Sequence, residues 1–108
     1  MKTVSNHYKN HRNKRENFIK EYLNDDGLMV DGFVVDRHHK DGLEIHSITE
    51  NGIILIHNLK SGKLITKLLA REEQIKRYYK STGRKPPPDY ENILALARWH
   101  ESLGYNNL

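Results

Sequence analysis

The chain has 108 residues and a formal net charge of +4, and this length fits a single domain. It contains no cysteine, which excludes disulfides, thiolate metal sites and cysteine nucleophiles. No run approaches the ~20 apolar residues of a membrane span, and the first residues lack the apolar segment of a secretion signal. We therefore expect a cytoplasmic protein with no membrane partner.

Basic and acidic residues are unevenly distributed along the chain. Residues 1–20 contain six Lys and Arg and one acidic residue, and residues 61–85 contain eight basic and two acidic residues. Residues 21–60, between these two blocks, contain eight acidic and three basic residues. Basic blocks on a small domain predict an anionic partner, most commonly nucleic acid. A solvated surface that only aids solubility explains them about equally well.

The N-terminal part predicts a helix followed by a strand. In residues 5–23, apolar side chains recur at spacings of three and four, which is the helical period. Gly27 ends a stop signal, because glycine readily adopts the left-handed conformation found at helix C-termini. Residues 28–36 then predict a strand in which Gly32 indicates a bulge, and residues 37–42 predict a loop.

The next segment predicts a three-stranded antiparallel meander. Three apolar runs are separated by two turn signals, and the expected strands cover residues 43–49, 53–58 and 63–70. Asn51-Gly52 favours a two-residue hairpin because both residues tolerate positive φ. Residues 58–62 suit a longer hairpin loop.

Two helices are predicted after the meander. Residues 72–81 form a short helix that Gly83 ends, and residues 84–88, with three consecutive prolines, form a stiff connector. Asp89 is a good N-cap for a last helix over residues 90–103. The inward stripe of this helix is expected to contain Ile93, Leu94, Leu96, Ala97 and Leu103. The helix is either a third structural helix or an arm that binds a protein partner.

The order of these elements predicts one α+β domain. Its four-stranded antiparallel sheet consists of the meander plus the strand over residues 28–36, and the helices pack on one face. One helix precedes the sheet and two follow it. The core of the domain covers residues 28–80, and the proline-linked C-terminal helix covers residues 89–103.

His46 is the first candidate for chemistry. If Leu43 and Ile45 face the core, then Glu44 and His46 face outward or into a groove. Histidine suits general acid or base catalysis because its ordinary pKa lies near neutrality. Glu44 lies on the same face of the strand, so it can hydrogen-bond the imidazole and hold it charged. A surface histidine beside a surface glutamate is the alternative interpretation.

Arg71 is the second candidate, at the junction of the last strand and a helix. A guanidinium can bind a phosphate through two hydrogen bonds, and the backbone N–H groups of a helix start also favour an anion. The two acidic residues that follow oppose phosphate binding. Gln74, Arg77 and Tyr78 can share the helix face that carries Arg71. A solvated helix with paired charges is the alternative.

Other polar residues have weaker signals. Thr49 and Thr66 place hydroxyls on the sheet, where they are either ordinary strand residues or donors to a phosphate. His38 and His39 match no metal-site spacing, and His39 is a better candidate for a second acid or base opposite His46. Motifs for nucleotide hydrolysis, dinucleotide binding, zinc proteases and serine hydrolases are absent from the sequence.

The segment over residues 39–79 resembles small phage- and toxin-associated nuclease domains of the barnase–EndoU–colicin E5/D–RelE superfold. The resemblance rests on Glu-Ile-His-Ser-Ile-Thr at residues 44–49, Asn-Gly-Ile at 51–53, Leu-Ile-Thr-Lys-Leu at 64–68 and the stretch from Ala70 to Tyr79. It implies helical N-terminal residues packed on a four-stranded antiparallel sheet. The long segment after residue 85 departs from the pattern.

The resemblance also implies an activity, which is RNA cleavage without a metal or another cofactor. In such enzymes a 2′-hydroxyl attacks its own phosphate and gives a cyclic phosphate. His46 would be the acid–base residue and Arg71 would stabilise the phosphate charge. Thr49, Thr66 or Tyr78 would assist. The sequence offers His39 as the candidate for a second acid–base group.

The surface that would bind nucleic acid is expected on the last strand and the first C-terminal helix. Its residues are Lys67, Gln74, Lys76, Arg77 and Lys80. The same residues fit a second interpretation, a non-catalytic protein of a phage or mobile element that binds nucleic acid or a nucleic-acid enzyme. A protein partner such as an inhibitor or antitoxin would bind the C-terminal helix.

Overall fold

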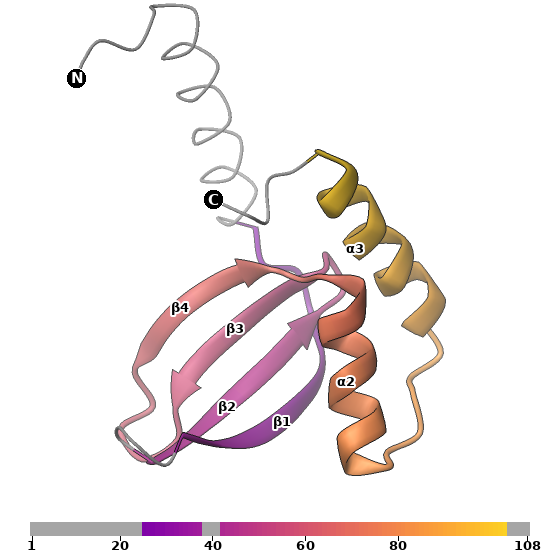
Figure 1. Cartoon of the computed structure of the whole chain (residues 1–108). Helices are drawn as coiled ribbons and strands as arrows, with labels where there is room; N and C mark the ends of the chain where they lie inside the picture. The colour runs from indigo at the N-terminus through magenta and orange to yellow at the C-terminus, as the bar shows by residue number, and fades with distance from the viewer. Residues whose placement is uncertain (1–24, 38–41, 104–108) are drawn as a thin grey trace, which may run out of the picture.

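The computed structural model describes residues 25–37 and 42–103. Within them the chain forms an α+β fold of four strands followed by two helices (Figure 1). The elements are β1 (Met29–Arg37), β2 (Gly42–Thr49), β3 (Ile53–Asn58), β4 (Leu64–Leu69), α2 (Glu72–Thr82) and α3 (Tyr90–Leu103). The predicted fold class and the two C-terminal helices are confirmed. The helix predicted over residues 5–23 lies outside the described residues.

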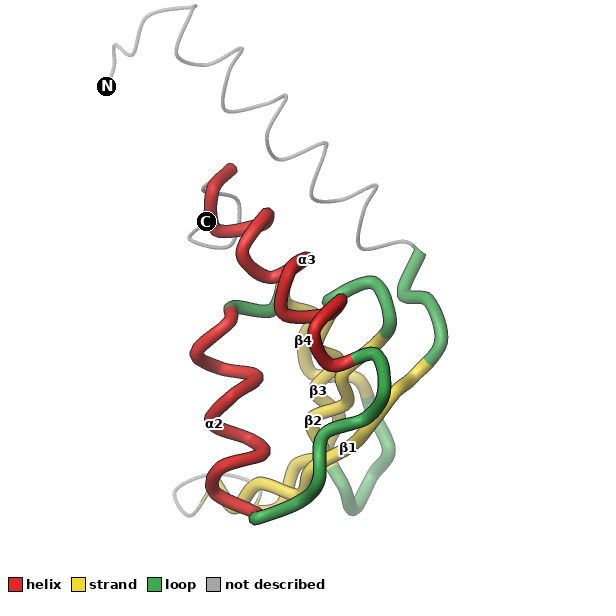
Figure 2. Tube along the Cα trace, turned by 90° about the vertical axis from the view of Figure 1, so that its right-hand side faces the viewer, coloured by secondary structure: helices red, strands yellow, loops and turns green. Residues whose placement is uncertain are grey.

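The sheet is an antiparallel meander in which each strand pairs with its neighbour in the sequence, in the order β1-β2-β3-β4. Helix α2 stands beside the sheet and α3 lies across its upper end (Figure 2). Neither helix, nor any other in the described ranges, is long and apolar enough to cross a membrane.

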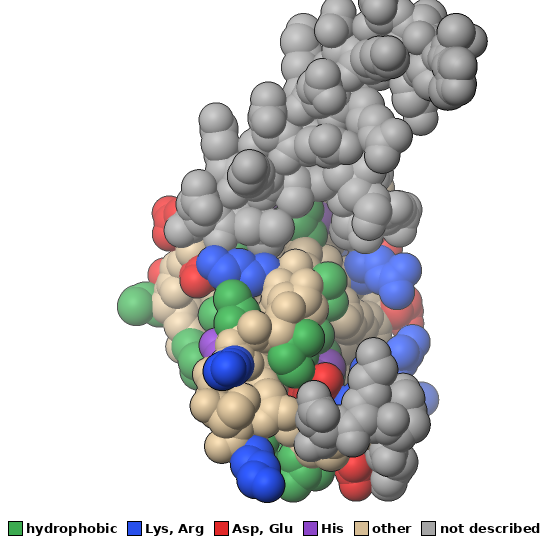
Figure 3. Space-filling view, turned by 90° about the vertical axis from the view of Figure 1, so that its left-hand side faces the viewer, with side chains coloured by type: hydrophobic (Ala, Val, Ile, Leu, Met, Phe, Trp, Pro, Cys, Tyr) green, Lys and Arg blue, Asp and Glu red, His purple; other side chains and the backbone are tan. Residues whose placement is uncertain are grey.

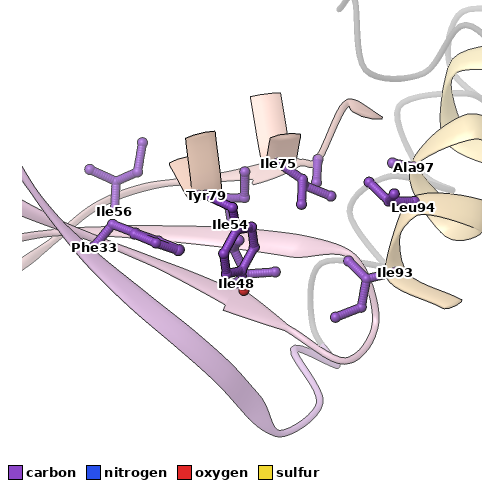
Figure 4. Packing of buried hydrophobic residues seen from close by; sticks show 10 residues of the cluster. Phe33, Ile48, Ile54, Ile56, Ile75, Tyr79, Ile93, Leu94 and Ala97 are labelled. Atoms are coloured by element: carbon purple, nitrogen blue, oxygen red, sulfur yellow. The ribbon is translucent and has the colours of Figure 1, made fainter. Parts of the chain in front are cut away.

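The core lies between the helices and one face of the sheet (Figure 4). Residues from adjacent strands face each other in the register, so that Phe33 lies opposite His46 and Ile48 lies opposite Ile54. The buried apolar side chains of this cluster are Phe33, Ile48, Ile54, Ile56, Ala70, Ile75, Tyr79, Ile93, Leu94 and Ala97. Each large side chain that is fully buried contributes about 1.5–3 kcal/mol to stability.

The faces of β2 are the reverse of the arrangement expected from the sequence. His46 and Ile48 are buried on the face covered by the helices, whereas Leu43 is 43% exposed. Because side chains alternate along a strand, Glu44 shares the helix-covered face with His46. Apolar residues occur on both faces of β2, and the helices cover the face on which Phe33, Ile48, Ile54 and Ile56 gather.

The β2–β3 connection is a three-residue loop rather than a two-residue hairpin. The Gly52 N–H donates to the Thr49 carbonyl at 3.0 Å, so Glu50 and Asn51 are the central residues of the turn. Gly52 then adopts a positive φ of 74°. This is the geometry in which a turn is followed by one left-handed residue. The dipeptide therefore predicted the position of the turn correctly, but not its length.

The irregularity in β1 lies near Val30 rather than at Gly32. Met29 pairs with Thr49 and Asp31 pairs with Ile48, so one residue of β1 has no counterpart on β2. Gly32 itself is in register. A Cβ at this position would make only an ordinary contact, 3.6 Å from the Ile45 side chain, so neither a bulge nor packing requires glycine here.

Asp31 of β1 binds the C-terminal end of α2 and the residue Arg84 that follows it. The Tyr79 hydroxyl donates to one carboxylate oxygen of Asp31 at 3.0 Å, and Arg84 bonds to the other. The Arg84 guanidinium also lies 4.3 Å from the centre of the Phe33 ring. Burial and the bond to Asp31 raise the pKa of Tyr79. Gly83, with φ of 68°, ends the helix as predicted. These contacts set where α2 lies along β1.

Helix α3 is an integral part of the core. Its buried residues are Ile93, Leu94, Ala97 and His100. The predicted inward stripe is thus partly wrong, since Leu103 is 36% exposed and His100 is fully buried. Helices α2 and α3 are joined by Glu72, whose carboxylate accepts from Arg98 at 2.6 Å and whose backbone N–H donates to Glu101 at 3.1 Å.

Candidate functional site

Three side chains from β2 and α2 form a continuous hydrogen-bonded chain. His46 Nε2 lies 2.9 Å from Glu44 Oε1, and His46 Nδ1 lies 2.5 Å from the Tyr78 hydroxyl. The predicted bond between Glu44 and the imidazole is therefore present. His46 is 5% exposed, so its ring is buried. Both of its nitrogens are hydrogen-bonded within the protein. We call Glu44, His46 and Tyr78 the relay.

The partners of the imidazole determine the direction of these bonds. A carboxylate accepts, so Nε2 carries a hydrogen and donates it to Glu44. In neutral histidine Nδ1 is then an acceptor, and the Tyr78 hydroxyl donates to it. In charged histidine Nδ1 also carries a hydrogen, and the Tyr78 oxygen accepts it. A proton can therefore move between Tyr78 and His46 without any change in the other bond.

The environment of Tyr78 keeps its hydroxyl protonated at neutral pH. Burial raises the pKa of Tyr78, while a hydrogen bond from Gln74 and the positive charges of Arg37 and Arg77 act in the opposite direction. The ring stacks on Phe33 with centroids 5.0 Å apart, which holds it in place. Tyr78 is only partly buried, so it is a more accessible member of the relay than His46.

Arg71 does not lie at this site. It is the N-cap residue of α2, exposed and in an extended conformation. The preceding Ala70 N–H donates to the Gly52 carbonyl at 2.8 Å, which places Arg71 near the β2–β3 turn. Tyr78 is seven residues further along α2, roughly 10 Å at the helical rise per residue. Arg71 lies where the last strand meets α2, as the sequence predicted, but at the opposite end of the helix from the relay.

The two threonines have different positions. The Thr49 hydroxyl is buried and accepts the backbone N–H groups of Asn51 at 3.3 Å and Ile53 at 3.2 Å, so it stabilises the turn. Thr66 is exposed on β4 and pairs with Ile56, which in turn pairs with His46. Two strand spacings, roughly 10 Å, therefore separate Thr66 from the imidazole. Neither threonine contacts the relay.

The residues expected to bind nucleic acid fall into three groups. Lys67 and Lys76 form ion pairs, with Asp26 at 2.9 Å and with Glu72 at 3.3 Å respectively. Gln74 bonds to Tyr78. Arg77 and Lys80 are exposed on α2. Seen from the β4 side, the Lys and Arg side chains are separated by apolar, acidic and neutral surface (Figure 3).

Arg37 is a further residue beside the relay. His39, the predicted second acid–base group, lies outside the described residues. Arg37 was not predicted, yet its Nε lies 4.0 Å from Glu44 Oε1. This proximity depends on the pairing of β1 with β2, because Arg37 and Glu44 are seven positions apart in the sequence. In residues 25–37 and 42–103 no group of three or more His, Asp and Glu side chains is arranged to hold a metal ion.

Comparisons of the chain with known protein families, with curated proteins and with solved structures find no match.

Proposed function

We propose that this protein is a small endoribonuclease that cleaves RNA by attack of a 2′-hydroxyl on the adjacent phosphate. The observation that carries the proposal is the relay: a carboxylate, an imidazole and a hydroxyl joined by bonds of 2.9 and 2.5 Å. An acid–base group aligned in this way is what the reaction needs, since it requires one proton to be removed and one to be supplied.

Tyr78 is the group that contacts the substrate in this proposal. As the 2′-oxygen attacks phosphorus, its proton passes to the Tyr78 oxygen, and the Tyr78 proton passes to Nδ1 of His46. The resulting imidazolium is stabilised by Glu44, in the way that a carboxylate stabilises the histidine of a serine-protease triad. The proton then returns through Tyr78 to the departing 5′-oxygen. One relay thus acts as base and then as acid, and no second histidine is needed.

The test is an RNA-cleavage assay in EDTA with wild type, His46→Gln and Tyr78→Phe. We expect 2′,3′-cyclic phosphate ends from wild type and a rate lower by about 10²–10⁴-fold in each variant, the usual contribution of acid–base catalysis. Tyr79→Phe is the matched control, because the neighbouring hydroxyl bonds to Asp31 rather than to the relay. Circular dichroism and thermal unfolding establish that each variant is folded.

Two results would count against the proposal. If folded wild type cleaves no RNA, the protein is not a ribonuclease. If Tyr78→Phe retains full activity while His46→Gln does not, the proton does not pass through tyrosine.

A second candidate is a binding protein that holds nucleic acid without cleaving it. The observation that favours it is the burial of His46, whose two nitrogens are both bonded within the protein. Binding would then depend on exposed basic residues of α2 such as Arg77 and Lys80, and would weaken steeply with salt because each phosphate contact releases counterions. If this second candidate is correct, wild type binds RNA but leaves it uncleaved in the assay.

A further inference from the structure

The relay has no cation of its own for the phosphate charge, although phosphoryl transfer depends on positive groups placed around the reacting phosphate. Arg71, the residue expected to supply one, lies roughly 10 Å along the helix from Tyr78. The position of the other basic residues therefore decides where a phosphate can bind.

Arg37 approaches the relay from β1. Its Nε lies 4.0 Å from Glu44 Oε1, and its side chain is 48% exposed. At this distance the two groups attract each other but do not form a close hydrogen bond. The guanidinium has five N–H donors, and most of them remain accessible to an incoming anion. A guanidinium also matches the geometry of a phosphate, to which it can donate two parallel hydrogen bonds.

Arg77 is the basic residue of α2 next to Tyr78 in the sequence. It directly precedes Tyr78, and it lies one helical turn after Gln74, which bonds to the Tyr78 hydroxyl. Its side chain is exposed and forms no ion pair within the described part of the chain. The charges of Arg37 and Arg77 both act to lower the pKa of Tyr78, in agreement with their positions on the two elements that meet at this hydroxyl.

Other basic residues of the same region are occupied elsewhere. Lys76 pairs with Glu72, and Arg84 is held between Asp31 and the Phe33 ring. These interactions direct both side chains away from the relay. Arg37 and Arg77 differ from them in combining exposure with proximity to Glu44 or Tyr78.

We propose that Arg37 and Arg77 together form a phosphate-binding pair over the relay, and that the ligand is a phosphodiester of single-stranded RNA. The inference rests on the proposed ribonuclease function and identifies the residues that bind its substrate. The two guanidiniums hold the scissile phosphate beside the Tyr78 hydroxyl and neutralise the second negative charge that develops as the 2′-oxygen attacks.

The experiment compares Arg37→Gln, Arg77→Gln and Arg71→Gln in two assays. Arg71 is a matched control, because it is also an exposed arginine of the α2 region without an ion pair in the described residues, but it lies roughly 10 Å from Tyr78 along the helix. In the EDTA cleavage assay we expect kcat/KM to fall about 10²-fold or more in the first two variants, as when one charge-stabilising donor is removed. The Arg71→Gln value should stay within about threefold of wild type.

The second assay measures binding of a fluorescent single-stranded oligonucleotide with 2′-O-methyl riboses, which cannot be cleaved. The plot of log affinity against log salt concentration has a negative slope. Loss of one phosphate contact should make this slope less steep by about 0.7. We expect this change for Arg37→Gln and for Arg77→Gln, but not for Arg71→Gln. Thermal unfolding establishes that all three variants are folded.

The two assays separate the failure of this proposal from the failure of the ribonuclease assignment. If wild type does not cleave RNA but its binding depends on Arg37 and Arg77, the phosphate-binding pair is supported and the enzyme assignment falls. If wild type cleaves RNA but Arg71→Gln loses as much activity and binding as the other two variants, the pair is overturned. Unchanged activity and binding in Arg37→Gln and Arg77→Gln would also overturn it.

Discussion

At the scale of single residues, Gly52 is the point where the β2–β3 turn meets α3. Its φ is +74°, and a Cβ at this position would lie 3.1 Å from His100 Cε1 and 3.2 Å from Leu96 Cβ. Two separate demands therefore favour glycine here. The backbone conformation disfavours any side chain, and a Cβ would fit against α3 only if His100 or Leu96 shifted.

We expect Gly52→Ala to destabilise the fold more than Gly62→Ala. Both glycines have φ of +74°, but a Cβ at Gly62 would have no atom within 4 Å. Gly62→Ala thus measures the backbone cost alone, about 1–2 kcal/mol. Gly52→Ala adds the cost of overpacking, commonly about 1–3 kcal/mol. Urea unfolding of the two variants gives both values. Equal losses would mean that α3 adjusts freely to the added methyl group.

We expect His100 to make the stability of the protein depend on pH. It is fully buried, and burial lowers its pKa below the ordinary value of 6.5, although a hydrogen bond with the Ala70 backbone acts in the opposite direction. The unfolded chain therefore binds a proton more readily than the folded one. The contribution of His100 to the stability of the folded state is therefore complete above pH 6.5. It declines as the pH falls from 6.5 toward the lower pKa that His100 has in the folded state.

The corresponding test is the pH dependence of urea unfolding in wild type and His100→Leu between pH 7.5 and 5. One proton taken up on unfolding changes the free energy by up to about 1.4 kcal/mol per pH unit. We expect the variant to lose stability less steeply than wild type over this range, even if it is less stable at pH 7.5. Parallel curves would show that His100 is not the titrating group.

Residue-level prediction from the sequence succeeded where two groups share one element. Glu44 and His46 are two positions apart on a strand, so their proximity follows from the alternation of side chains. The prediction that Arg71 lies beside His46 was wrong. The position of α2 along the sheet is set by packing around Asp31 and Phe33, not by local sequence. Arg37 could not be found without the register of β1 against β2.

At the scale of elements, strand and helix positions were predictable because their signals are local. Glycines at residues 52, 62 and 83 have positive φ and end or connect elements as expected. Which face of β2 is buried was not predictable, because apolar residues occur on both faces and the choice depends on α2 and α3. The helix predicted over residues 5–23 stays a prediction.

Helix α3 provides the test at this scale. A chain that ends at Lys85 lacks Ile93, Leu94, Ala97 and His100, all of which are buried. Their loss removes several kcal/mol of burial, comparable with the whole stability of a small domain. We expect no cooperative unfolding transition in this chain. Leu103→Ser, on the exposed side of the same helix, should change stability by less than about 1 kcal/mol.

The opposite outcome is also informative. If the shortened chain keeps its cooperative transition, α3 is a detachable arm, and the sheet and α2 are sufficient for folding. Trp99, which is 44% exposed, would then be the first residue to examine for contact with a protein partner.

At the scale of the whole molecule, formal charge overstates how much of the basic surface is available. Two basic residues of the second block form ion pairs with a different part of the described fold, Lys67 with Asp26 and Arg84 with Asp31, and Lys76 pairs with Glu72 within α2. Some basic residues of these blocks therefore form ion pairs within the fold, and others are available to bind a partner. Only the folded arrangement distinguishes the two.

The chain order of the sheet also has a consequence for biosynthesis. Each strand after β1 pairs with the strand made just before it, so the sheet can assemble while the chain emerges from the ribosome. Tyr78, however, is 32 residues later than His46 in the sequence, and it reaches the imidazole only when α2 docks. We therefore expect a growing chain to hold a folded sheet before it holds a complete relay. Any activity of the relay would begin only after the last part of α2 has been synthesised.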